Sequence, residues 1–149
     1  MARELLLIAL VVACGRDKAT KPRAAAAGPP LASKAFYRVD AGPNAPCTSG
    51  TTCEVRLELT ALGDYHVNKD YPFKFVGDPG PPPAGQPAVQ IDGAGTFALD
   101  DAKHGIMTIK FRPTASGTAK LVGTFKLSVC SDETCEIEAP KLELAVPVS

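Results

Sequence analysis

Two cysteines near the C-terminus, Cys130 and Cys135, have a spacing suited to thiol chemistry across a hairpin. The four residues between them are polar and stand between strand-like flanks, so the two cysteines are expected to face each other. A disulfide needs Cβ atoms about 3.5–4.5 Å apart, which favours the closer, non-hydrogen-bonded type of cross-strand pair. Cys130 alternates in phase with Lys126 and Ser128, which predicts that it lies on the polar face, within reach of an incoming thiol.

This pair has three possible roles, namely inert staple, redox-active pair and metal ligand. A bridge that closes so short a loop removes little entropy from the unfolded chain, which makes it a weak staple. Negative charge nearby disfavours the thiolate and so counts against catalysis. The acidic residues concerned are Asp132, Glu133, Glu136 and Glu138. The staple is favoured over redox activity, and metal binding ranks last.

A second pair, Cys47 and Cys53, flanks a small polar loop ahead of a strand-like segment. Four cysteines allow three disulfide pairings, and export to an oxidising compartment favours disulfides. We prefer 47 with 53 and 130 with 135, because each pair brackets a turn-like stretch. Cys47–Cys53 is then expected to pin the chain where it enters the domain. Zinc held by all four cysteines is disfavoured, because paired zinc ligands usually stand two to four residues apart.

The two histidines carry weaker signals. His104 and Met107 could bind copper. Met107, however, is in phase with core-facing residues, so a core methionine is favoured. His66 is interpreted as a solvated loop residue. No hydrolase or transferase motif is recognised, and neither a metal nor another cofactor is expected.

The N-terminus predicts a lipid anchor. The apolar run Leu5–Ala13 is far shorter than the roughly 20 residues that span a bilayer, so it indicates a signal peptide at 1–13. Val11–Ala13 followed by Cys14 resembles the lipobox of bacterial lipoproteins. The resemblance implies cleavage before Cys14, diacylglycerol on its sulfur and acylation of the new N-terminus. We therefore expect a protein of the cell envelope, anchored to the outer or inner membrane and facing the periplasm or exterior.

Residues 14–34 are expected to be a flexible tether, because they are rich in Ala, Pro and Lys and nearly free of large apolar residues. Positions 15–34 hold five basic residues against one acidic, whereas positions 35–149 hold ten against fourteen. The basic tether could approach anionic lipid headgroups, or its charges could be solvated as in an ordinary linker. The mildly acidic remainder lacks a basic stripe, so no nucleic-acid partner is expected.

Positions 35–149 predict one all-β domain, an immunoglobulin-like antiparallel sandwich of about seven to eight strands. Apolar and polar residues alternate along its strand-like segments, as in strands with one buried face. Pro72 restricts its strand to an edge, or else is the first residue of that strand. The expected strand segments are 53–61, 71–75, 107–111, 119–129 and 142–148.

Two motifs resemble the N-terminal periplasmic domain of DsbD-type thiol:disulfide interchange proteins. They are Leu127–Ile137, with its cysteine pair on the penultimate strand, and Gly63–Asn68. The resemblance implies that Cys130 and Cys135 form the redox pair, which takes electrons from a membrane-embedded partner and passes them to periplasmic thiol proteins. This chain departs from the family at Glu136–Glu138, where the family usually has a proline pair, and at Leu127–Ser128, where it usually has an aromatic and glutamine.

Two functions are therefore expected. The favoured one is a non-enzymatic module that binds an envelope protein or stabilises an assembly, with a surface near Pro72 or the Pro-rich loop Gly77–Gln86. The alternative is thiol:disulfide exchange through Cys130 and Cys135 with a thiol-redox partner.

Overall fold

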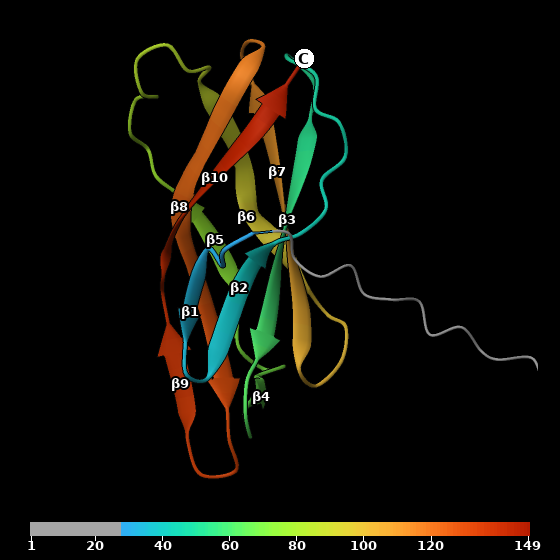
Figure 1. Cartoon of the computed structure of the whole chain (residues 1–149), viewed down its shortest axis with the longest axis vertical. Helices are drawn as coiled ribbons and strands as arrows, with labels where there is room; N and C mark the ends of the chain where they lie inside the picture. The colour runs from blue at the N-terminus through green and yellow to red at the C-terminus, as the bar shows by residue number, and fades with distance from the viewer. Residues whose placement is uncertain (1–27) are drawn as a thin grey trace, which may run out of the picture.

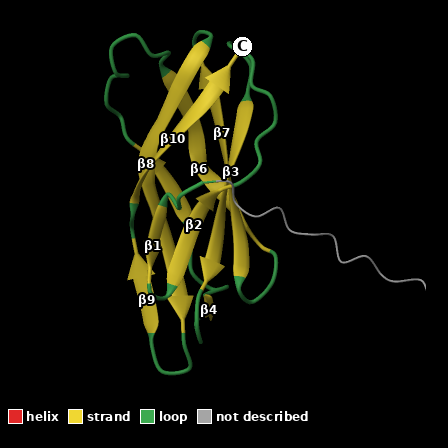
Figure 2. Ribbon diagram, viewed as in Figure 1, coloured by secondary structure: helices red, strands yellow, loops and turns green. Residues whose placement is uncertain are grey.

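Alternating apolar and polar residues fold this chain into two antiparallel sheets packed face to face (Figures 1 and 2). The computed structural model describes residues 28–149, so the signal peptide, Cys14 and most of the expected tether lie outside the described residues. All ten elements of the described range are strands, which confirms the expected all-β sandwich. They are β1 (Ala32–Lys34), β2 (Tyr37–Ala41), β3 (Cys53–Ala61), β4 (His66–Val67), β5 (Lys74–Gly77), β6 (Val89–Leu99), β7 (His104–Pro113), β8 (Gly117–Cys130), β9 (Cys135–Glu138) and β10 (Lys141–Val148).

One sheet has the order β1-β2-β3-β7-β6, and the other is built around the long strand β8. Strands β9 and β10 pair with the same edge of β8 and in the same register. Ala139 and Pro140 separate the two strands. Strands β4 and β5 pair with the opposite edge of β8, with a shift in register between them. The expected count of seven to eight strands is exceeded partly because these two interruptions divide longer strands.

The core lies between the sheets, where every second residue of the main strands points inward. In β3 the buried positions alternate with more exposed ones from Cys53 to Ala61, as predicted. Aromatic side chains fill the middle: Phe125 of β8 is fully buried, and Phe73 stacks on Phe97 of β6 with ring centroids 3.8 Å apart. The two sheets are therefore held together by apolar contact across their facing surfaces.

Gly123 of β8 gives a direct test of this packing. A Cβ on Gly123 would lie 2.5 Å from Phe75 Cζ and 2.6 Å from the backbone oxygen of Val76, which cannot rotate away. Gly123→Ala is therefore expected to lower the free energy of unfolding by about 1–3 kcal/mol. Gly80→Ala is the matched control, since no atom lies within 4 Å of its added Cβ. Equal denaturation midpoints for the two variants would contradict this packing.

The structure corrects two expected boundaries. The strand expected at 71–75 begins only at Lys74, because Tyr71 and Phe73 lie in turns in which their N–H groups donate to Asn68 and Tyr71 carbonyls. Strand β1 lies within the stretch expected to be tether. It begins at Ala32 because Ala32–Lys34 pairs with β2, and the Leu31 N–H donates to the Val39 carbonyl.

Candidate functional site

The turn between β8 and β9 forms one end of the molecule (Figure 1). The Ser131 N–H donates to the Thr134 carbonyl at 2.8 Å, which leaves Asp132 and Glu133 as a two-residue loop. The Ser131 hydroxyl accepts bonds from the Glu133 and Thr134 N–H groups at 3.3 and 3.2 Å. This serine thus fixes the turn from within, as short polar side chains commonly do.

Cys130 and Cys135 form the next cross-strand pair and are joined by a disulfide, with Cα atoms 4.0 Å apart. Because hydrogen-bonded and non-hydrogen-bonded pairs alternate, the bond between Ser131 and Thr134 makes 130/135 a non-hydrogen-bonded pair. This is the closer type of cross-strand pair, which a disulfide needs. The second disulfide joins Cys47 and Cys53, so the structure has the preferred pairing.

The expectation that Cys130 is reachable on a polar face is wrong. Cys130 is only 6% exposed, whereas Cys135 is exposed. Near its end β8 has β4 on one side and β9 on the other, and the next residue on the outer face, Ser128, is fully buried. The Asn68 amide donates to the Ser128 hydroxyl at 3.2 Å from the turn after β4. Cys135 is therefore the more exposed half of the bridge.

His66 is exposed, as expected, but it lies in a strand beside the bridge and not in a loop. It begins β4 and is the direct cross-strand partner of Cys130, so both side chains point to the same face of the sheet. His66, Cys130 and Cys135 thus form one row across three strands. Sequence reasoning missed this row because β4 has only two residues, too few for an alternation pattern.

The surroundings of the bridge are acidic. Asp132 and Glu133 are exposed at the turn, and Glu136 is half-buried. Glu138 is neutralised by Lys34 of β1, whose Nζ lies 2.6 Å from its carboxylate, and this hydrogen bond raises the pKa of Lys34. Within the described residues no ion pair involves the other three carboxylates.

A hollow of about 530 Å³ lies between the hairpin turn and the β3–β4 loop. Its charged lining consists of the carboxylates Asp64, Asp132 and Glu133. The loop is held from behind by Lys103, whose ammonium donates at 2.5 Å to the carbonyls of Gly63 and Tyr65. The hollow therefore has a fixed wall and a negatively charged rim.

The copper hypothesis for His104 and Met107 is not supported by their positions. Met107 is fully buried in the core, as expected. His104 is on the opposite face of β7 and contacts Asp101 at 2.8 Å, a hydrogen bond that lowers the pKa of Asp101. The structure does not bring the two candidate ligands together.

The Cys47–Cys53 disulfide lies at the other end of the sandwich. Both residues are buried, and the Cys47 carbonyl accepts a bond from the Ser149 N–H at 2.9 Å. All four cysteines are consumed by disulfides, which leaves no thiolate for the four-cysteine zinc site. No group of three metal-ligating side chains is found within residues 28–149.

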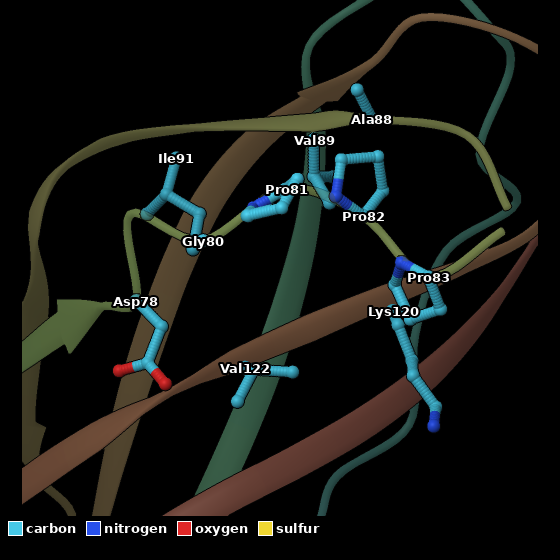
Figure 3. Close-up of a pocket in the computed structure, with 10 residues that line it drawn as sticks. All are labelled: Asp78, Gly80, Pro81, Pro82, Pro83, Ala88, Val89, Ile91, Lys120 and Val122. Atoms are coloured by element: carbon cyan, nitrogen blue, oxygen red, sulfur yellow. The ribbon is translucent and has the colours of Figure 1, made fainter.

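The Pro-rich loop after β5 lies over a second candidate surface (Figure 3). A hollow of about 310 Å³ is lined by Pro81–Pro83 together with Val89 and Ile91 of β6 and Lys120 and Val122 of β8. A neighbouring hollow of about 430 Å³ shares Val89 and Ile91. Among the described strands, none pairs with β8 beyond Gly123 on this side, although Val122 accepts one bond from Asp78.

Comparison with known proteins gives no relative: no family model, no curated protein and no solved structure matches this chain. Within the described residues no helix is long and apolar enough to cross a membrane. The interpretation of the two surfaces therefore depends on their own geometry.

Proposed function

We propose that the sandwich performs thiol:disulfide exchange at the Cys130–Cys135 bridge, on a chain anchored to an envelope membrane through lipid on Cys14. The observation that carries the proposal is the asymmetry of the bridge. An exposed Cys135 at the end of the molecule is joined to a buried Cys130. Exchange demands a sulfur that an attacking thiolate can reach, and Cys135 supplies one.

The asymmetry sets the order of events. The thiolate of a dithiol partner attacks Cys135 Sγ, the sulfur–sulfur bond breaks, and Cys130 leaves as a thiolate that takes up a proton. The thiolate of the partner's second cysteine then attacks the sulfur of the partner's first cysteine in the mixed disulfide. This step releases Cys135 as a thiolate, which takes up a proton. Two electrons pass to the domain, which becomes a dithiol, and the partner becomes a disulfide.

A purely structural role explains the bridge less well. The hairpin turn is already closed by the Ser131–Thr134 bond and by the Ser131 hydroxyl. The Cys130–Cys135 disulfide is at the next cross-strand pair, and the loop that it closes is too short for the bridge to remove much entropy from the unfolded chain. Cys47–Cys53 also spans a turn, in which the Thr51 N–H donates to the Thr48 carbonyl at 3.2 Å, but both of its cysteines are buried, as suits a structural bridge.

Selective reduction tests the proposal. The Cys14→Ser protein is exposed to dithiothreitol under native conditions, alkylated and analysed by peptide mass spectrometry. Cys130 and Cys135 are expected to be labelled while the buried Cys47–Cys53 bridge stays oxidised. The proposal fails if both bridges resist equally or if Cys47–Cys53 is reduced first.

A second candidate function is binding of an extended protein segment at the Pro-rich loop. The backbone N–H and C=O groups of successive residues in a strand point to opposite sides. Those of even-numbered β8 residues, such as Thr118 and Lys120, therefore point toward the hollow at this loop. Among the described strands this part of the β8 edge has no partner, and such an edge beside apolar Val89 and Ile91 suits an added strand. Apolar octapeptides are expected to bind in fluorescence anisotropy, and Val122→Lys is expected to weaken them about tenfold or more. Equal binding by both proteins rejects this candidate.

A further inference from the structure

We infer that the Cys130–Cys135 bridge selects thiols that carry or lie among positive charges, such as a cysteine on a basic protein surface. The inference rests on the proposed exchange function and specifies its substrate class. Two independent observations meet at one end of the molecule, namely an exposed Cys135 and the carboxylates of the adjoining hairpin loop, Asp132 and Glu133, which form no ion pair within the described residues.

The charges lie on both elements that approach the bridge. Asp132 and Glu133 form the hairpin loop, and Glu136 follows Cys135 on β9 but on the opposite face of the strand, where its charge helps to raise the pKa of Lys34. Asp64 faces the hairpin from the β3–β4 loop across the hollow that it shares with Asp132 and Glu133. Of the nearby bases, Lys34 pairs with Glu138, whereas Lys103 donates to two neutral carbonyls of the same loop and so keeps a positive charge that offsets part of the field of Asp64. His66 is the remaining ionisable group in the row of the bridge.

The negative electrostatic field of these carboxylates repels the attacking group, because the nucleophile is a negatively charged thiolate. One carboxylate about 10 Å away lowers the local concentration of a singly negative reagent, or raises that of a singly positive one, about twofold at low ionic strength. Three such carboxylates give about eightfold for each unit of charge. A positive group on the attacking molecule offsets the repulsion of its thiolate, and a second negative group doubles it.

The hollow beside the hairpin adds a place for such a group. Its volume of about 530 Å³ and its three carboxylates suit an arginine or lysine side chain of a protein partner. A partner that seats a basic residue there would hold its cysteine near Cys135. Charge complementarity of this kind raises association rates more than it raises affinity.

The test uses three small thiols that differ in charge: cysteamine, 2-mercaptoethanol and 2-mercaptoethanesulfonate. Rate constants for reduction of Cys130–Cys135 are measured with the Cys14→Ser protein and corrected for the thiolate fraction of each reagent. The same series is run on the Asp132→Asn, Glu133→Gln, Glu136→Gln variant, so that intrinsic differences between reagents cancel. At about 10 mM salt, the cysteamine-to-sulfonate ratio is expected to be at least tenfold higher for the native sequence than for the variant.

At about 0.5 M salt, the two proteins are expected to agree within about twofold, because the charges are screened. Equal ratios for the two proteins at low salt would overturn the inference and leave exchange intact. Failure of all three thiols to reduce the bridge would instead overturn the proposed function itself.

Discussion

Replacing Cys135 with serine is expected to abolish exchange and to leave a thiol on Cys130 that hardly reacts in the folded protein. Cys130 is 6% exposed, with β4 and β9 on either side of its strand. The reverse change, Cys130→Ser, leaves the exposed Cys135 as the free thiol. We expect Cys135 to react with a maleimide about ten times faster or more than Cys130, because reactivity follows access to the sulfur.

The comparison is made in the Cys14→Ser background, so that only one free thiol is present in each variant. The same reaction in guanidinium chloride is the control, and there the two rates should converge. Comparable rates in the folded proteins would show that Cys130 is as accessible as Cys135. The order of attack proposed for the bridge would then be wrong.

Phe125→Ala is expected to cause a large loss of stability. Phe125 is fully buried between the sheets, with ring centroids 6.4 Å from Phe73 and 6.5 Å from Phe97. Truncation removes apolar contacts with both sheets and leaves a cavity, so the free energy of unfolding should fall by about 3–5 kcal/mol. Urea denaturation with both disulfides intact measures the change.

Ile137→Ala is the matched control, because Ile137 is also a large apolar residue but is 67% exposed. Its effect should stay within about 0.5 kcal/mol. If Phe125→Ala were equally mild, the two sheets would not share the core described here. If Ile137→Ala were as severe, the outer face beside the bridge would be a packed surface.

Local patterns predicted the strands that have one buried and one solvated face. Strand β3 begins and ends where alternation placed it, because Cys53–Ala61 alternates without interruption. The hairpin at Cys130 was also readable, since its polar loop and flanks are contiguous in the sequence. Strand β6 was not found, because Gly93–Gly95 shifts its register against β7 and interrupts the pattern.

The features that decide reactivity could not be predicted, because they depend on segments distant in the sequence. Alternation assigned Cys130 to a polar face, but it cannot tell what packs on that face. Asn68 reaches Ser128 from sixty residues away, and His66 meets Cys130 only through pairing of β4 with β8. The burial of one sulfur and the exposure of the other are therefore results of tertiary structure.

The reduction potential of the Cys130–Cys135 pair tests the central claim most directly. The Cys14→Ser protein is equilibrated across a series of glutathione and dithiothreitol buffers, and its thiols are counted by alkylation and mass spectrometry. Exchange predicts a potential above about −250 mV, in the range of proteins that pass electrons between thiols, with Cys47–Cys53 still oxidised. A potential below about −300 mV would mark the bridge as a structural staple and contradict the proposed function.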